Sequence, residues 1–280
     1  MVDQEIMKNK TILITGGTGS LGQELTIHIL KQSPKSIRVF SRGEALQLEM
    51  QQRLDNKIVR FLIGDVRDIN RLKRAMTNAD IVIHVAALKQ VPTCEYNPIE
   101  AVRTNIDGSV NIVDAALDCG VGKVLAISSD KAIHPVNLYG ATKLVMEKLV
   151  VQANVYGDTK FSCVRFGNFW GSRGSVIPLW EEQRRTGTIT LTDGDMVRFW
   201  INLEEAAEFT LSCVERMEGG EIFIPRMPSL TMKEIANAVA PEAKFEIIGK
   251  RPGEKLHELL FAEGEEERSI KEDDCWIIKA

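Results

Sequence analysis

The fold of this chain is decided by the segment Thr11-Ile12-Leu13-Ile14-Thr15-Gly16-Gly17-Thr18-Gly19-Ser20-Leu21-Gly22. Its first five residues form a short, apolar, β-branched run that predicts a buried strand. The glycines at 16, 19 and 22 follow in a GxxGxxG spacing, and a helix-like stretch continues to Leu30. Glycine permits a tight strand-to-helix turn, and the free N–H groups that begin such a helix attract a phosphate. The segment therefore predicts a dinucleotide site that includes Gly16, Thr18, Gly19, Ser20, Leu21 and Gly22.

Strand-like and helix-like stretches alternate through the rest of the N-terminal half. Short apolar runs that predict strands lie at 37–40, 59–63, 80–85 and 124–128. Stretches that predict helices lie at 44–54, 69–76, 102–119 and 138–155. Such alternation is typical of a parallel sheet with helices on both faces. The sequence therefore predicts an α/β fold with a Rossmann-type, doubly wound parallel sheet.

The pattern changes after about residue 165, where glycine, proline and other turn residues become denser. We therefore expect a dinucleotide-binding domain at 1–165 and a smaller C-terminal substrate-binding lobe at 166–280. Residues 199–216 are expected to pack back on the first domain. The acidic run from Glu263 to Arg268 is expected to be a solvated surface turn.

Composition and charge limit the classes of function. Of the 280 residues, 44% are hydrophobic and 26% are charged, which is typical of a soluble globular protein. The net charge of −4 argues against a broad nucleic-acid-binding surface. Residues 1–5 are polar and acidic, unlike an export signal, and no apolar run reaches the ~18 residues of a membrane span. The five cysteines form no CxxC pair, so we expect reduced thiols, no metal site and a cytoplasmic location.

The residues that follow the second, third and fourth predicted strands bear on the choice of dinucleotide. No acid follows Phe40; instead, Ser41 can donate a hydrogen bond and Arg42 can pair with a 2′-phosphate, which favours NADP over NAD. Asp65 is expected to bond the adenine amino group, and small residues after the fourth strand leave room beside the cofactor. The residues expected at these strand ends are Ser41, Arg42, Asp65, Val66, Ala86 and Ala87.

The segment from Ser128 to Lys143 is predicted to carry the catalytic side chains. Tyr139 and Lys143 are four residues apart, so on a helix they share one face. A free tyrosine has a pKa of ~10, too high for a base at neutral pH. A nearby ammonium and an oxidised nicotinamide both favour the phenolate, so we expect this pair to activate a hydroxyl group.

The Tyr-x-x-x-Lys spacing of this run resembles the extended, sugar-nucleotide-modifying branch of the short-chain dehydrogenase/reductase superfamily. With Ser129-Asp130-Lys131, the chain is similar to the inverting UDP-N-acetylglucosamine 4,6-dehydratases of pseudaminic acid biosynthesis and related pathways. Segments that support the resemblance are Ala87 to Pro92, Glu95 to Pro98, Arg165 to Asn168, Gly171 to Val176, Arg198 to Ile201 and Arg251 to Lys255.

The resemblance implies an order of steps. Tyr139 would take the proton of the sugar's 4-hydroxyl while a tightly bound, recycled NADP accepts hydride from carbon 4. Lys143 would hold the cofactor ribose, and Ser129 would bond the 4-oxygen. Lys131 would then act as base at carbon 5 and Asp130 as acid for the leaving 6-hydroxyl. Hydride returning to carbon 6 and a proton returning to carbon 5 would give a 4-keto-6-deoxy sugar of L-arabino configuration.

The resemblance also implies which residues hold the ligands. Asn105 joins the cofactor residues, as does Lys89, which could reach the substrate as well. The residues expected to bind UDP-N-acetylglucosamine are Lys89, Asn168, Arg173, Val176, Arg198, Arg251 and Glu254.

Four other functions remain open at this point. In retaining relatives a glutamate stands where Lys131 stands here, so the lysine favours inversion, but a retaining enzyme is an alternative. Release of the 5,6-ene intermediate is another. A UDP-sugar 4-epimerase would need no acid for a leaving hydroxyl, which Asp130 and Lys131 argue against. An NADP- and UDP-sugar-binding sensor would bind without turnover. The family also implies a homo-oligomer, either a dimer or a hexamer.

Overall fold

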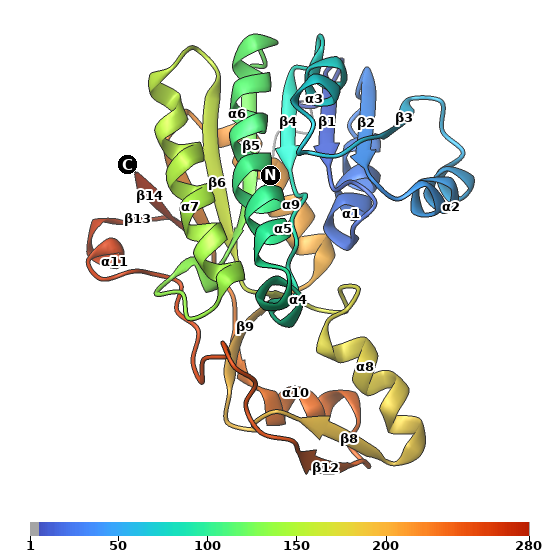
Figure 1. Ribbon diagram of the computed structural model, residues 1–280, viewed down its shortest axis with the longest axis vertical. Helices are drawn as coiled ribbons and strands as arrows, with labels where there is room; N and C mark the ends of the chain where they lie inside the picture. The colour runs from blue at the N-terminus through green and yellow to red at the C-terminus, as the bar shows by residue number, and fades with distance from the viewer. Residues whose placement is uncertain (1–5, 280) are drawn as a thin grey trace.

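A computed structural model describes residues 6–279, so the acidic stretch at 1–5 lies outside the described residues. A large sheet with helices on both faces stands above a smaller lobe, and the carboxyl ends of its central strands point toward that lobe (Figure 1). Among the described residues, no helix combines the length and apolar character needed to cross a membrane.

The large sheet has the strand order β13-β14-β10-β6-β5-β4-β1-β2-β3. Pairing is parallel from β3 to β10, whereas β14 and β13 are antiparallel additions at one edge. The predicted doubly wound parallel sheet is thus confirmed. Its strands are β1 (Thr11–Thr15), β2 (Ser36–Ser41), β3 (Val59–Ile63), β4 (Ile81–His84), β5 (Lys123–Ser129), β6 (Lys160–Phe166), β10 (Glu221–Pro225), β13 (Ile270–Lys271) and β14 (Cys275–Lys279).

Alternating side chains of the buried strands supply two cores, one on each face of the sheet. Ile12 and Ile14 face a core shared with α1 (Ser20–Leu30) and α9 (Leu203–Arg216). Leu13 faces the opposite core, which α3 (Ile69–Met76), α6 (Gly108–Asp118) and α7 (Leu138–Gln152) cover. Strands buried on both sides need continuous apolar runs, and this requirement made them recognisable in the sequence. The edge helix α2 (Glu44–Leu54) has the predicted bounds.

The smaller lobe has its own core, formed around Trp180, Trp200 and Met232. Two small sheets and two helices build it. They are β7 (Asn168–Phe169), β9 (Val197–Ile201) and β11 (Ser229–Thr231); β8 (Thr188–Leu191) and β12 (Lys244–Ile247); and α8 (Val176–Gln183) and α10 (Met232–Val239).

The chain crosses between the two parts more often than a boundary after residue 165 implies. Helix α9 packs on α1, whereas residues 199–201 belong to β9 of the smaller lobe. Strands β10 and β14 also lie in the large sheet, although both belong to the range 166–280. Apolar runs such as Ile222-Phe223-Ile224 fit the free edge of β6, where they are buried on both faces.

The helix expected at 102–119 is confirmed in its main part, but it begins earlier, at Pro98, and contains a π-helical turn. The chain forms α4 (Val91–Tyr96), then α5 (Pro98–Val102), a π-helical turn at Arg103–Asp107, and only then α6. Within that turn Asn105 accepts from the N–H of Leu88 at 2.8 Å and donates to its carbonyl at 2.9 Å. A π-turn widens the helix by one residue, and here it lets a buried amide reach a neighbouring loop.

The solvated surface segment expected at Glu263 to Arg268 is confirmed, since every residue in it except Glu265 is exposed. Residues Glu265–Arg268 form a short helix, α11, and Glu265 reaches the interior. There the guanidinium of Arg165, which is 1% exposed, donates two hydrogen bonds to Glu147 and two to Glu265, at 2.9 and 3.4 Å. Arg165 also donates to the carbonyl of Leu260 at 2.6 Å. A buried cation needs such partners, so charge pairing holds the C-terminal segment against β6 and α7.

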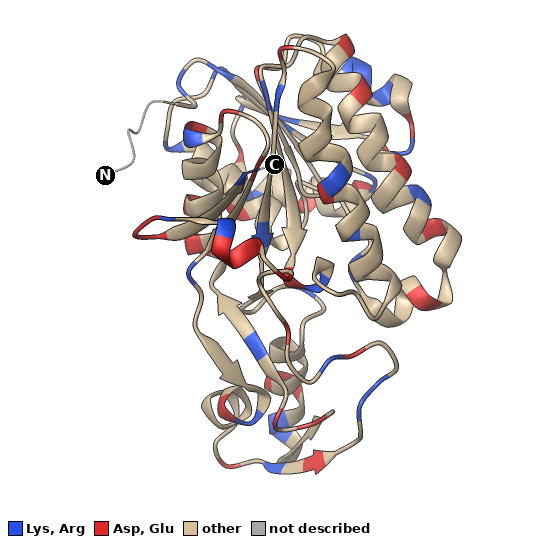
Figure 2. Cartoon of the chain, turned by 90° about the vertical axis from the view of Figure 1, so that its left-hand side faces the viewer, with Lys and Arg blue, Asp and Glu red and all other residues tan. Residues whose placement is uncertain are grey.

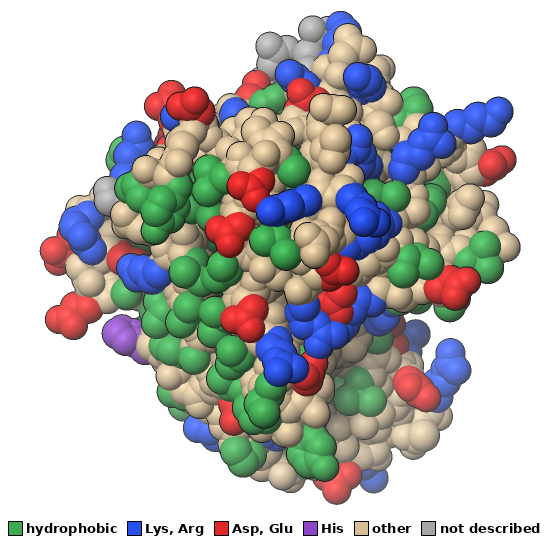
Figure 3. All heavy atoms as spheres, turned by 45° about the horizontal axis from the view of Figure 1, so that its top comes forward, with side chains coloured by type: hydrophobic (Ala, Val, Ile, Leu, Met, Phe, Trp, Pro, Cys, Tyr) green, Lys and Arg blue, Asp and Glu red, His purple; other side chains and the backbone are tan. Residues whose placement is uncertain are grey.

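Charged residues of both signs are interspersed over the helices and loops in the side view of Figure 2. Apolar side chains gather on the left of the face drawn in Figure 3. Val110 of α6 and Val145 of α7 are among the exposed large apolar residues of the molecule.

Replacing Arg165 tests whether this buried charge pairing carries stability. We expect Arg165→Met to lower the free energy of unfolding by about 3–5 kcal/mol, because it leaves two carboxylates without their cation. Urea denaturation measures this. The exposed Arg60→Met is the matched control and should change stability by no more than about 0.5 kcal/mol. Equal losses in the two variants would contradict a buried charge network.

Candidate functional site

A cavity of about 840 Å³ runs between the carboxyl ends of the large sheet and the smaller lobe. All but three of the expected site residues line it. The exceptions are Gly22, Asn105 and Asp130. Ligands of open α/β sheets bind at this edge, which explains why residues from distant parts of the chain meet here.

The glycine loop forms one end of the cavity. Gly16 has φ of 65°, and a Cβ there would lie 2.8 Å from the backbone of Ala86. Gly22 serves packing, since a Cβ would lie 2.6 Å from Gly17 Cα. Helix α1 begins at Ser20 with no side-chain cap and no acid in its first turn. Its first N–H groups are therefore free to bind an anion in the cavity.

Arg42 and Asp65 lie together beyond β2 and β3, with 3.9 Å between Nη1 and Oδ2. Burial acts to raise the pKa of Asp65, but hydrogen bonds from Arg67 outweigh it, so the pKa lies below its ordinary value. The Ser41 hydroxyl accepts from Gln47 at 3.0 Å, which leaves its own proton available to a ligand. This end of the cavity therefore offers a guanidinium and a hydroxyl donor.

Tyr139 and Lys143 share the cavity-facing side of α7. Burial raises the pKa of Tyr139 well above its ordinary value, although a hydrogen bond with Ser129 works in the opposite direction. Burial lowers the pKa of Lys143 to about 8, and its Nζ donates to the carbonyl of Ile127 at 2.6 Å. The side chains alone thus do not lower the tyrosine pKa. The expected lowering has to come from a positive charge bound beside the phenol.

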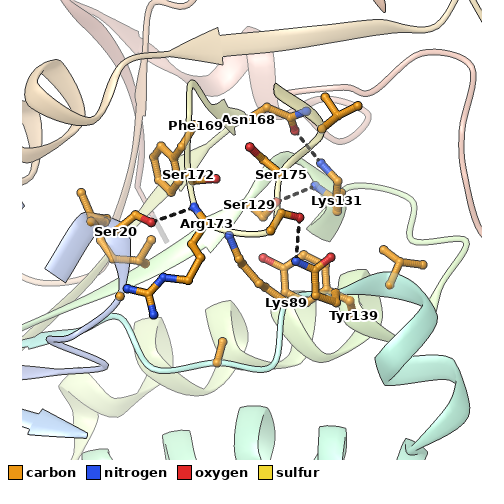
Figure 4. Close-up of a pocket in the computed structure, with 18 of the residues that line it drawn as sticks. Ser20, Lys89, Ser129, Lys131, Tyr139, Asn168, Phe169, Ser172, Arg173 and Ser175 are labelled. Carbon is orange, nitrogen blue, oxygen red and sulfur yellow. Dashed lines mark hydrogen bonds between the residues drawn. The ribbon is translucent and has the colours of Figure 1, made fainter. Parts of the chain in front are cut away.

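The Ser129-Asp130-Lys131 run leaves β5 through a 3-10 turn at Asp130–Ala132. Asp130 is fully buried; its Oδ1 accepts from Ser129 at 2.9 Å and from Lys131 Nζ at 3.0 Å. Lys131 Nζ also donates to Asn168 at 3.0 Å, and Figure 4 shows Ser129, Lys131 and Asn168 near one another at the cavity. Only Lys131 of the acid–base pair lines the cavity directly, since Asp130 stands behind it.

Positive charge gathers between this wall and the glycine loop. Desolvation lowers the pKa of Lys89, and the nearby charges of Arg173 and Lys131 lower it further. The backbone N–H of Arg173 donates to Ser20 at 2.9 Å (Figure 4), and its guanidinium donates to the carbonyl of Thr18 at 3.1 Å. Converging cations of this kind suit a diphosphate.

Arg198, Arg251 and Glu254, three of the residues expected to bind the substrate, have different surroundings. Both terminal nitrogens of Arg198 bond carbonyls of the chain, including Lys255 at 2.9 Å and Leu256 at 3.1 Å. Arg198 therefore positions the 255–256 backbone. Arg251 is exposed, and its N–H donates to Glu254 at 3.1 Å. Arg251 and Glu254 both line the cavity, as do Asn168 and Val176.

Two features of the site differ from the prediction, the place of Asn105 among the cofactor residues and the presence of Glu258. Asn105 does not line the cavity; it holds Leu88, the neighbour of Lys89, from behind. Glu258, which was not predicted, lines the cavity and lies 3.9 Å from Lys131 Nζ. Glu258 lies in a segment without regular secondary structure. No periodic pattern in the sequence therefore predicts that its side chain is buried.

The comparisons with known proteins agree with this geometry. Residues 12–280 match the model of a family described as polysaccharide biosynthesis proteins. A UDP-N-acetylglucosamine 4,6-dehydratase (inverting) of Campylobacter jejuni is 47% identical over 98% of this chain and 84% of its own. A UDP-glucose 4-epimerase of Rickettsia bellii is 42% identical over 92% of this chain and 79% of its own. The solved structure of Pen from Bacillus thuringiensis has a TM-score of 0.95 at 42% identity, covering 98% of this chain and 89% of that one.

The stability of the site edge should depend on pH through His84. Burial lowers the pKa of this ring to about 3 from 6.5, and its nitrogens face Thr15 at 2.7 Å and Ser109 at 3.4 Å. Below pH 6.5 His84 binds a proton in the unfolded chain but stays neutral in the folded chain. Its contribution to the free energy of unfolding is therefore fully present above pH 6.5 and is lost as the pH falls toward 3.

The measurement is urea unfolding at several pH values. Between those limits we expect His84→Gln to reduce the slope of unfolding free energy against pH by up to about 1.4 kcal/mol per unit. Above about pH 7 the slopes of the two proteins should coincide. Equal slopes on the acid side would contradict a neutral buried ring.

Proposed function

Because the chain belongs to the family of polysaccharide biosynthesis proteins, we propose that it is an NADP-dependent, inverting UDP-N-acetylglucosamine 4,6-dehydratase. The observation that carries the proposal is the position of Lys131. Its Nζ stands at the cavity wall, bonded to Asp130 and Asn168, beside the Tyr139–Lys143 pair. Oxidation of a hydroxyl group requires only Tyr139 and Lys143. Elimination of water also requires an acid and a base, which Asp130 and Lys131 would supply.

The residues at the sheet edge fit a dinucleotide. The glycine loop and the uncapped start of α1 would hold its pyrophosphate, while Ser41 and Arg42 would hold a 2′-phosphate. Lys143 would bond the ribose near the nicotinamide. Bound there, NADP would supply the chemistry of accepting a hydride from carbon 4 and returning it to carbon 6.

The chain's own groups handle the protons of the oxidation. Tyr139 takes the proton of the 4-hydroxyl, and Ser129 donates a hydrogen bond to the 4-oxygen. The ketone at carbon 4 makes the proton on carbon 5 acidic. Because the protein alone raises the pKa of Tyr139, the phenolate forms only with a cation beside it.

Elimination then requires a free amine and a protonated carboxyl at one place. Transfer of one proton from the Lys131 ammonium to Asp130, across their 3.0 Å hydrogen bond, produces both forms at once. The amine takes the proton from carbon 5, the C6–O bond breaks, and a carboxyl proton leaves with the hydroxyl as water. A proton later returns to carbon 5 on the face opposite the one that Lys131 deprotonates, because inversion requires delivery from that side. A lysine at this position is our reason for proposing inversion.

The UDP part of the substrate would lie toward the smaller lobe. Lys89 and Arg173 carry the charge for its diphosphate, and Arg251 and Glu254 form the turn nearest its nucleoside. Arg198 contributes by fixing that segment. We also propose a cytoplasmic homo-oligomer, a dimer or a hexamer, and the exposed valines of α6 and α7 support such an interface.

A UDP-sugar 4-epimerase is the second candidate, supported by the identity to the Rickettsia protein of that name. Epimerisation would leave Asp130 and Lys131 without a chemical role. A retaining dehydratase, release of the 5,6-ene and a non-catalytic sensor all predict different products, so one experiment separates them.

That experiment follows UDP-N-acetylglucosamine with the protein and NADP in deuterated water by proton NMR. We expect a 4-keto-6-deoxy sugar that carries deuterium at carbon 5 and has altered ring couplings. Retained couplings would indicate a retaining enzyme, olefinic signals would indicate release of the 5,6-ene, and a 4-epimer would indicate an epimerase. Unchanged substrate, with NADP bound, would overturn the proposal and favour a sensor.

The NADP preference is tested at Arg42. A charge-assisted bond to a phosphate is worth about 1.5–3 kcal/mol, so Arg42→Ala should weaken NADP binding by about ten- to a hundredfold. NAD, which lacks the phosphate, should bind within about twofold of the unaltered protein. Calorimetric titration with both dinucleotides measures this, with Arg60→Ala as the control. Equal weakening of both ligands would show that Arg42 does not read the phosphate.

A further inference from the structure

Glu258 is a buried carboxylate that the proposed steps do not use. Its side chain is 3% exposed, yet it lines the cavity beside Lys131. A buried carboxylate is costly unless it is paired, and two lysines supply the pairing. Its Oε1 lies 3.9 Å from Lys131 Nζ, and its Oε2 lies 3.2 Å from Lys255 Nζ.

The backbone that carries Glu258 is fixed on both sides. On one side, Arg198 bonds the carbonyls of Lys255 and Leu256, while Lys255 Nζ donates to the carbonyl of Ile133. On the other side, Arg165 bonds the carbonyl of Leu260. The carboxylate is therefore held at a set place opposite the catalytic turn.

The three neighbours of Lys131 Nζ differ in their relation to the cavity. Asp130 and Asn168 accept its two hydrogen bonds, both of 3.0 Å. Of the two carboxylates, only Glu258 lines the cavity; Asp130 lies behind the wall. An ammonium has three donors, and 3.9 Å is an ion-pair distance longer than a hydrogen bond. The third position on Nζ thus stays open toward the cavity while Glu258 attracts the nitrogen in that direction.

We infer that Glu258 is a positioning residue for Lys131 and sets its access to carbon 5 of the sugar. Without the Glu258 charge, Lys131 Nζ is drawn toward Asp130, away from the cavity. The inference rests on the proposed function. It separates two halves of the reaction: removal of the carbon-5 proton depends on Glu258, whereas oxidation at carbon 4 by Tyr139 does not.

The test measures both halves in one sample. The protein with bound NADP is mixed with UDP-N-acetylglucosamine in deuterated water. Absorbance of the reduced nicotinamide follows oxidation at carbon 4, and NMR follows deuterium entering carbon 5. In Glu258→Gln we expect reduction within about twofold of the unaltered protein. Decay of the reduced cofactor and carbon-5 labelling should slow by about ten- to a hundredfold, a part of the ~10²- to 10⁴-fold that a positioned acid or base contributes.

Two further variants test whether the charge of Glu258 is what matters. Glu258→Asp keeps the charge and should recover part of the carbon-5 step. Lys255→Met removes the other partner of Glu258 and should show the same split in a milder form, which serves if Glu258→Gln does not fold. The exposed Glu246→Gln on β12 is the matched control and should leave both halves unchanged.

The outcomes separate this inference from the proposed function. Equal slowing of both halves would make Glu258 a general structural residue, and an unchanged or faster carbon-5 step would contradict its positioning role. Either result overturns the inference. Unaltered protein that reduces no cofactor and forms no 4-keto product would instead overturn the proposed function itself.

Discussion

The burial of one guanidinium organises the wall of the cavity. Arg165 lies at the end of β6, inside the large sheet, where a cation is costly without close anions. It meets Glu147 of helix α7 and Glu265 of the C-terminal segment. Because the requirement for charge pairing joins these elements, the segment that follows the smaller lobe returns to the large sheet. Residues 251–258 are thereby brought against the turn that carries Lys131.

The return of this segment explains why a site at the sheet edge needs the smaller lobe. The large sheet presents Ser129 at the end of β5 and Lys131 in the turn that follows, whereas the carboxylate that faces Lys131 from the cavity, Glu258, comes from outside the sheet. Glu258 comes from irregular chain that has no sheet partner beyond one bridge between His257 and Val197. Its position depends on Arg198, Asn137 and Arg165, whose side chains bond carbonyls along residues 253–260. Side-chain bonds to the backbone here take the place of a regular element.

Local signals made much of the fold and site predictable from the sequence. The apolar runs and the glycine turn fix β1, and the ends of parallel strands fix the edge where Ser41 and Asp65 lie. The spacing of Tyr139 and Lys143 places both on one face of α7. Long-range pairings were not predictable: Arg165 and Glu265 are a hundred positions apart. The burial of Asp130 and the π-turn at Asn105 also depend on neighbours that no local pattern contains.

The tyrosine pKa shows how the fold could order the proposed steps. Burial raises the pKa of Tyr139 and lowers the pKa of Lys143 to about 8. Lys143 Nζ donates a hydrogen bond to the carbonyl of Ile127. The phenol is thus a poor base until a positive charge lies beside it. An oxidised nicotinamide carries that charge and a reduced one does not. Tyr139 would therefore release its proton readily only before the hydride has moved, and would hold the captured proton while Lys131 acts at carbon 5. Burial, which by itself opposes catalysis by this residue, would in this way keep the two proton transfers in sequence.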